Sequence, residues 1–166
     1  MVPPIFSSAR TNHRGAKYVT ETDDDTATDD ALLRIGVALM VWHPSLDPAV
    51  LTAALAREPL RCWRAGEPRM SASGDSLPGI WPQSYWVADR TVEGRRDFFG
   101  AIGDEVAALE ACAELLGRIL AEGGEIHLKI ELSGETNIGD VMPAPMLLRL
   151  GALGVGLAVE VFPDMA

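Results

Sequence analysis

One strand-like segment of the sequence carries the residue types that general acid–base catalysis needs. His127 alternates with Glu125, Lys129 and Glu131, so these four polar side chains would share one face of a strand. A histidine with a carboxylate two residues away can transfer protons near neutral pH. A solvated strand face with mixed charges accounts for the same pattern, and no partner from another segment can be named. A small enzyme with His127 as acid or base is therefore an alternative hypothesis.

The histidines and cysteines do not have the spacing of a metal site or of a reactive thiol. His43, His127, Cys62 and Cys112 are widely separated, and the sequence contains no CxxC pair. Cys112 lies within an expected helix between two glutamates, a setting that disfavours a thiolate. The signatures of nucleotide-binding loops, serine hydrolases, zinc proteases and calcium loops are also absent from the sequence. We therefore predict no catalytic residue, no metal, no cofactor, and two buried thiols.

The densest group of aromatic and cationic side chains lies between Trp63 and Trp86. This segment holds three of the four tryptophans on either side of an irregular loop, residues 65–79. An aromatic floor with an arginine rim suits a peptide, an anion or a loop of a partner protein. Tryptophans also anchor small α+β cores, so burial is the competing interpretation. The candidate binding residues are Trp63, Arg64, Glu67, Arg69, Trp81, Tyr85 and Trp86.

The expected strands follow from alternation of apolar residues. A strand at about 32–42 is apolar on both faces, which predicts a central position in a sheet. Short strands at 60–64 and 83–89 would pair antiparallel around the irregular loop. A strand at 126–132 alternates apolar and polar residues, so its polar face would be exposed to water. The segment 155–161 predicts a last apolar strand.

The expected helices have clear boundary signals. Leu46-Asp47-Pro48 supplies a cap and a proline at the first helical position, and Pro59 prevents this helix from continuing. One apolar stripe predicts the longest helix over about 102–121, followed by Gly123-Gly124. A short helix is expected from about Pro145 to residue 153. Residues 91–97 are expected to form a polar loop.

The predicted fold is a single α+β domain at residues 31–166, in the order βαββαβαβ. A mainly antiparallel sheet would carry its helices on one face, and the first six elements match a ferredoxin-like split unit. Residues 1–30 are predicted to be a disordered acidic tail, because they hold three basic and six acidic residues without an apolar period.

Composition excludes several functional classes. With 166 residues, 48 % of them hydrophobic, the chain can build one core without disulfides or metals. Its net charge of −10 would repel nucleic-acid phosphates, so no nucleic-acid partner is expected. No apolar run reaches the ~18 residues of a membrane span, and no secretion signal is evident. A cytoplasmic location without membrane partners is the expectation.

A set of short motifs resembles a known bacterial family. These motifs are Leu46-Asp47-Pro48, Pro59, Trp63-Arg64, Gly66-Glu67, Trp86 and the segment 150–154 before an apolar last strand. In this order they resemble domain of unknown function 4279, over about residues 33–162. Glu67 stands where members of the family more often have aspartate. The resemblance implies an α+β fold, and it brings no established activity, cofactor or catalytic residue.

The sequence therefore favours a non-enzymatic binding or interaction protein that uses the Trp63–Trp86 region. A toxin-neutralising, immunity-like partner protein is one alternative, because an acidic body would suit a basic toxin. A homodimer held by sheet faces or edges is another alternative. The small enzyme that uses His127 is the remaining hypothesis.

Overall fold

The computed structural model describes residues 34–93, 98–133 and 140–162. The expected acidic tail, residues 1–30, lies outside these residues. The described chain is an α+β fold with a five-stranded, mainly antiparallel sheet, which confirms the predicted fold class. In chain order its elements are β1 (Arg34–His43), α1 (Pro48–Leu55), β2 (Arg61–Trp63), β3 (Pro68–Met70), β4 (Ser76–Ile80), β5 (Ser84–Glu93), α2 (Phe98–Glu110), α3 (Ala113–Ala121), β6 (Glu125–Ser133), α4 (Ala144–Ala152) and β7 (Gly156–Phe162).

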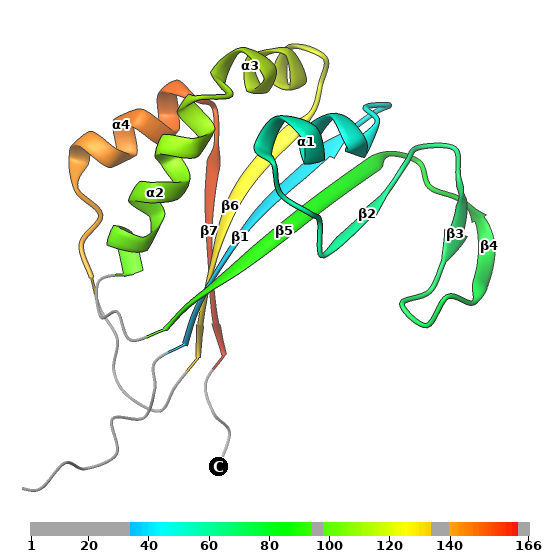
Figure 1. Cartoon of the computed structure of the whole chain (residues 1–166), viewed down its shortest axis with the longest axis horizontal. Coiled ribbons are helices and arrows are strands. Elements are labelled where there is room, and N and C mark those ends of the chain that lie inside the picture. The colour runs from blue at the N-terminus through cyan, green and yellow to red at the C-terminus, as the bar shows by residue number, and fades with distance from the viewer. Residues whose placement is uncertain (1–33, 94–97, 134–139, 163–166) are drawn as a thin grey trace, which may run out of the picture.

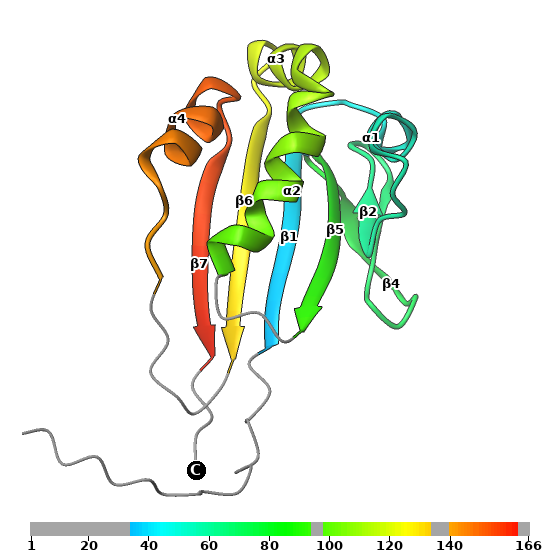
Figure 2. The same cartoon turned by 60° about the vertical axis from the view of Figure 1, so that its left-hand side comes forward.

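The sheet has the strand order β2-β5-β1-β6-β7 (Figure 2). β1 pairs antiparallel with both β5 and β6, which confirms its predicted central position. β2 pairs antiparallel with β5, while β7 pairs parallel with β6 after the crossover through α4. All four helices of the described chain lie on one side of this sheet (Figure 1), so the other side carries none of these helices.

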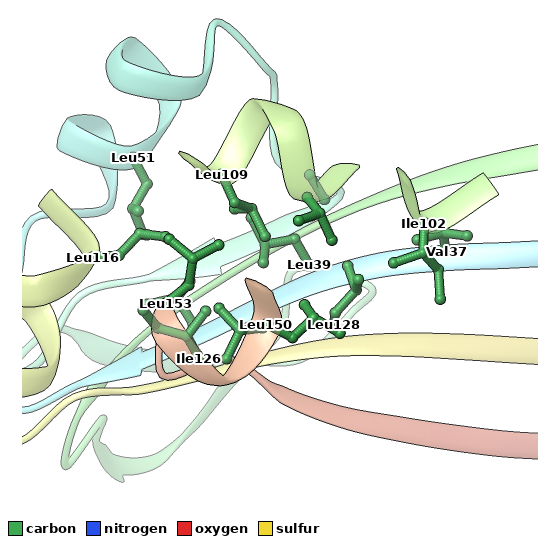
Figure 3. Packing of buried hydrophobic residues seen from close by; sticks show 14 of the residues in the cluster. Val37, Leu39, Leu51, Ile102, Leu109, Leu116, Ile126, Leu128, Leu150 and Leu153 are labelled. Carbon is green, nitrogen blue, oxygen red and sulfur yellow. The ribbon is translucent and has the colours of Figure 1, made fainter. Parts of the chain in front are cut away.

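The main core fills the space between the sheet and the helices (Figure 3). Leu39 of β1 and Leu128 of β6 are completely buried there, against Ile102 and Leu109 of α2. Leu51 brings α1 into the same core, and Leu150 brings in α4. Burial of each of these side chains stabilises the fold by about 1.5–3 kcal/mol. This core fixes which side of every strand faces the helices.

The helix α1 begins as its sequence signals predict. Asp47 is the N-cap, and its Oδ1 accepts the N–H of Ala49 at 3.0 Å, while Pro48 occupies the first turn. The helix ends four residues before Pro59, at Leu55, because Ala56 adopts a left-handed conformation with φ 48°. The chain then passes through residues 57–60 into β2.

Three features of the structure differ from the predicted elements. The loop 65–79 forms a hairpin of β3 and β4, which projects beyond the sheet (Figure 1). Gly66, Gly74 and Gly79 take positive φ there, a conformation that glycine adopts readily. The predicted long helix is divided at Cys112 into α2 and α3, although its apolar stripe continues. In addition, β5 extends into the segment expected to be a polar loop, residues 91–97, as far as Glu93.

Candidate functional site

Five aromatic rings form a continuous line across the open side of the sheet. Strand pairing creates this line, since Trp63 of β2 lies opposite Tyr85 of β5, and Tyr85 lies opposite Trp42 of β1. Trp81 follows β4 and extends the line at one end, while His127 of β6 extends it at the other. We call Trp81, Trp63, Tyr85, Trp42 and His127 the aromatic row. It joins four strands of the main sheet to the end of the hairpin.

The rings of the aromatic row pack against one another. Trp81 and Trp63 stack with centroids 4.1 Å apart and planes 16° apart. Tyr85 packs on Trp63 at 4.5 Å and on Trp42 at 5.1 Å, and Trp42 meets His127 edge-on at 5.2 Å. Trp63 is therefore held between two rings. Such contacts add about 0.5–1.5 kcal/mol each beyond area burial, so they help to hold the rings in this arrangement.

The aromatic row is half-buried rather than enclosed. Tyr85 is 9 % exposed, and its burial raises the pKa of its phenol despite the opposing charges of Lys129 and Arg61. Trp42, Trp63, Trp81 and His127 keep intermediate exposure. Ala38 and Val87 lie on the same face of the sheet and form a second small buried cluster with Tyr85, with Met40 packed against it. The open side of the sheet thus carries an apolar strip that water still reaches.

Trp86 does not belong to this surface, contrary to the prediction from the sequence. Its side chain is 1 % exposed and lies in the main core under the helices. Its indole N–H donates to Oγ1 of Thr52 at 3.1 Å. Consecutive residues of a strand point to opposite faces, so Tyr85 and Trp86 cannot share one surface. The competing interpretation, burial in the core, is correct for Trp86.

Trp42 is the member of the row that sequence reasoning missed. It lies at the end of β1, far from the Trp63–Trp86 segment in the sequence. Only the register of β1 against β5 brings it beside Tyr85. Alternation along β1 places Trp42 on the face away from Leu39 and Val41, and this signal was present in the sequence. The sequence did not show that Tyr85 lies opposite Trp42.

The predicted polar residues Arg64 and Glu67 hold the turn that presents Trp81. Oε2 of Glu67 accepts the N–H of Arg64 at 3.2 Å, and Nη1 of Arg64 donates to Oδ2 of Asp47 at 3.1 Å. Backbone hydrogen bonds from Gly66 to Trp81 and from Trp81 back to Glu67, both 2.9 Å, close the base of the hairpin. Together with the positive φ of Gly66, these contacts give the Gly-Glu motif a structural role.

Arg69 is the predicted cation that lies on the aromatic row. Its guanidinium carbon is 5.2 Å from the centroid of the Trp81 ring. A cation at this distance over an indole contributes about 0.5–1 kcal/mol when exposed. Of the expected arginine rim, Arg69 lies over the end of the row and Arg61 lies near enough to influence Tyr85, whereas Arg64 pairs with Asp47 at the start of α1.

Charged residues border the aromatic row on β6 and β7. Nζ of Lys129 contacts Glu131 and lies 3.2 Å from Oε2 of Glu160. The hydrogen bond with Glu131 is the largest influence on Lys129; it raises the pKa of the ammonium against the opposing effect of burial, and Glu160 adds to it. Lys129 therefore stays charged at physiological pH, and together with Glu131 and Glu160 it forms a group with one net negative charge.

The two described histidines do not form a catalytic arrangement. Among residues 34–93, 98–133 and 140–162, no carboxylate forms an ion pair with His127, whose ring contacts Trp42. His43 is 3 % exposed, and its Nδ1 accepts the N–H groups of Ser45 and Leu46 at 3.0 and 2.8 Å. Its Nε2 lies 3.3 Å from a Glu122 oxygen without hydrogen-bond geometry. His43 thus stabilises the turn after β1.

A pocket beside His43 is too small for a substrate. It is lined by His43, Leu51 and Ser84 among others, and it has room for about one water molecule. Within the described ranges, no group of three or more histidine, cysteine, aspartate or glutamate side chains could hold a metal ion. The enzyme hypothesis therefore gains no support from these residues.

Cys62 is exposed on β2, whereas both thiols were expected to be buried; Cys112 has intermediate exposure. Cys62 lies on the edge strand β2, opposite Trp86 of β5. Partial burial raises the pKa of the Cys62 thiol first, and the nearby charges of Glu67, Asp47 and Glu58 raise it further. An exposed thiol with a raised pKa is accessible but weakly reactive.

We expect iodoacetamide to alkylate Cys62 along a pH profile whose midpoint lies above the ~8.5 of a free cysteine. At any lower pH a smaller thiolate fraction is present, so the rate falls. Glu67→Gln should lower the midpoint part of the way toward that of a free cysteine. This substitution removes a negative charge but keeps a hydrogen-bond acceptor. Peptide mass spectrometry measures the rate, with Glu125→Gln as the control. Equal midpoints for Glu67→Gln and the unmodified chain would contradict this account.

Comparisons with protein-family models, curated proteins and solved structures give no significant match. The resemblance to domain of unknown function 4279 therefore stays a prediction. None of the helices in the described ranges is both long enough and apolar enough to cross a membrane.

Proposed function

We propose that this chain is a non-enzymatic binding protein that holds a protein partner on the open side of its sheet. The aromatic row is the single observation that carries this proposal. Half-exposed aromatic side chains that gather over several strands, on a side without helices in the described chain, are typical of interaction surfaces. Tryptophan and tyrosine also supply large contact area at low cost in conformational entropy.

The packing of the rings favours a protein over a nucleic acid or a sugar. Bases stack on open aromatic faces, but Trp63 already lies between Trp81 and Tyr85. Nucleic acids also need a basic groove, whereas the chain has a net charge of −10. Side chains and backbone carbonyls of a protein can pack on the exposed ring edges, which carry the positive end of the ring quadrupole.

The charge of the chain favours a positively charged partner. Glu131 and Glu160 border the aromatic row, and the net charge of the whole chain is negative. A basic partner would be attracted on approach and oriented by this border. A toxin-neutralising role is a more specific form of the same proposal, since it requires such a basic partner.

The test compares variants of the full chain as baits in lysate from its native host. Trp42→Ala combined with Trp63→Ala should reduce capture of the specific partner at least roughly tenfold, the effect of losing one modest hot spot. Val50→Ala is the matched control, because Val50 is an exposed apolar residue of α1 on the opposite side. Quantitative mass spectrometry measures capture, and circular dichroism verifies folding.

Two outcomes would overturn the proposal. One is the same set of captured proteins for the unmodified chain, the double variant and Val50→Ala. The other is loss of the partner in Val50→Ala alone, which would move the binding surface to the helical side.

A further inference from the structure

β7 is an edge strand without the usual protection against pairing. In the described chain it has β6 on one side and no strand on the other. Its pairing with β6 runs from Gly156 to Phe162 without a register shift, so no bulge twists the edge away. Its sequence contains neither lysine nor proline. Edges of soluble sheets normally carry such features, because free N–H and C=O groups attract another strand.

Apolar side chains are also exposed along this edge strand. Leu157, Val159 and Val161 alternate on the side that faces the helices, and they are 37, 50 and 65 % exposed. Leu147 and Leu148 of the neighbouring α4 are 51 and 74 % exposed. Figure 2 shows β7 at one margin of the sheet, with α4 over only one end of it. The exposed edge and the exposed apolar side chains thus coincide.

The charge pattern of β7 allows the strand to pair with a second copy of itself. Glu160 is its only charged residue, and it is already paired with Lys129 of β6 at 3.2 Å. Val159 is the midpoint of Gly156–Phe162. An antiparallel copy centred on Val159 pairs all seven residues and sets each Glu160 opposite Ala158. The two Glu160 side chains are then diagonal neighbours rather than directly opposite, and each is paired with Lys129 of its own β6.

We propose that two copies of this chain pair through β7, antiparallel about a two-fold axis at Val159, and form one continuous sheet. On the helix side, Val159 then meets Val159 of the second copy, and each Leu157 meets a Val161. These cross-strand pairs cover the apolar side chains that are exposed in the single chain. A two-fold axis perpendicular to the sheet keeps the helices of both copies on one side. The aromatic rows remain free on the other side.

The first test measures the oligomeric state of the full chain by light scattering over a concentration series. The unmodified chain should be a dimer at micromolar concentration, and added salt should tighten it because each copy carries −10. Val161→Lys should raise the dissociation constant at least roughly a hundredfold. Ile80→Lys is the matched control, since Ile80 is a strand residue of the hairpin with 62 % exposure against 65 % for Val161. This variant should remain a dimer.

A second test examines the register and does not depend on a weakened interface. In a Cys62→Ser background, Val159→Cys should form an intermolecular disulfide under mild oxidation, because opposed antiparallel residues have Cα atoms about 4.5–5.5 Å apart. Ile80→Cys should not form one. A monomer at all concentrations up to ~100 μM would overturn the proposal, as would dissociation by Ile80→Lys. A dimer without the Val159→Cys disulfide would overturn the proposed register.

Discussion

Trp86→Ala is expected to lower the free energy of unfolding by about 3–5 kcal/mol. The indole is 1 % exposed and lies in the main core between the sheet and α1. Its removal leaves a cavity that the surrounding strands cannot close, and it leaves Oγ1 of Thr52 without the indole N–H. Urea denaturation followed by circular dichroism measures the loss. An effect of this size would remove a large part of the stability of a single domain.

Trp63→Ala is the matched control for this prediction. Trp63 is half-buried on the open side, so its removal opens the surface rather than a closed cavity, and about 1–2 kcal/mol is expected. Thr52→Val should cost about 1–3 kcal/mol, because the buried indole N–H loses its acceptor. Equal losses for Trp86→Ala and Trp63→Ala would contradict the assignment of the two tryptophans to opposite sides of the sheet.

The parts of the fold that local sequence signals control could be predicted. Asp47 and Pro48 specify the start of α1 through one hydrogen bond and one fixed φ angle, both independent of the rest of the chain. Alternation along β6 separates Ile126 and Leu128 from His127 because the strand period is two residues. The apolar faces of β1 likewise predicted its position between two strands. In each case the necessary information lies within a few residues.

The candidate site depends on contacts between distant segments, which the sequence does not specify. Proximity in the sequence grouped Tyr85 with Trp86, but the pleat of β5 places them on opposite sides. Trp42 joins the row through the register of β1, which the whole core determines. The division of the predicted long helix at Cys112 could not be predicted either. Apolar residues of both α2 and α3 line the main core, so the apolar pattern of the sequence does not reveal the break between the two helices.

Arg57→Ala is expected to destabilise the fold by about 3–5 kcal/mol, far more than a usual surface ion pair. Nη2 of Arg57 donates to both carboxylate oxygens of Glu105, at 3.0 and 2.9 Å. The Glu105 side chain is 3 % exposed and that of Arg57 is 26 % exposed, so this pair joins the end of α1 to α2 inside the structure. Alanine removes the positive charge that faces a buried carboxylate, and the carboxylate cannot regain its hydration in place. Thermal and urea denaturation measure the loss.

Two comparisons separate the effect of burial from the effect of ion pairing as such. Arg64→Ala breaks an ion pair with Asp47 whose side chains are 52 and 46 % exposed, and it should cost less than about 1 kcal/mol. Arg57→Met combined with Glu105→Leu removes both charges and fills the same space, so most of the stability should return, to within about 1–2 kcal/mol of the unmodified chain. If the double variant is as unstable as Arg57→Ala, specific hydrogen bonding at Glu105, rather than a buried charge, holds the helices together. If Arg57→Ala and Arg64→Ala cost the same, the burial of Glu105 does not strengthen the pair.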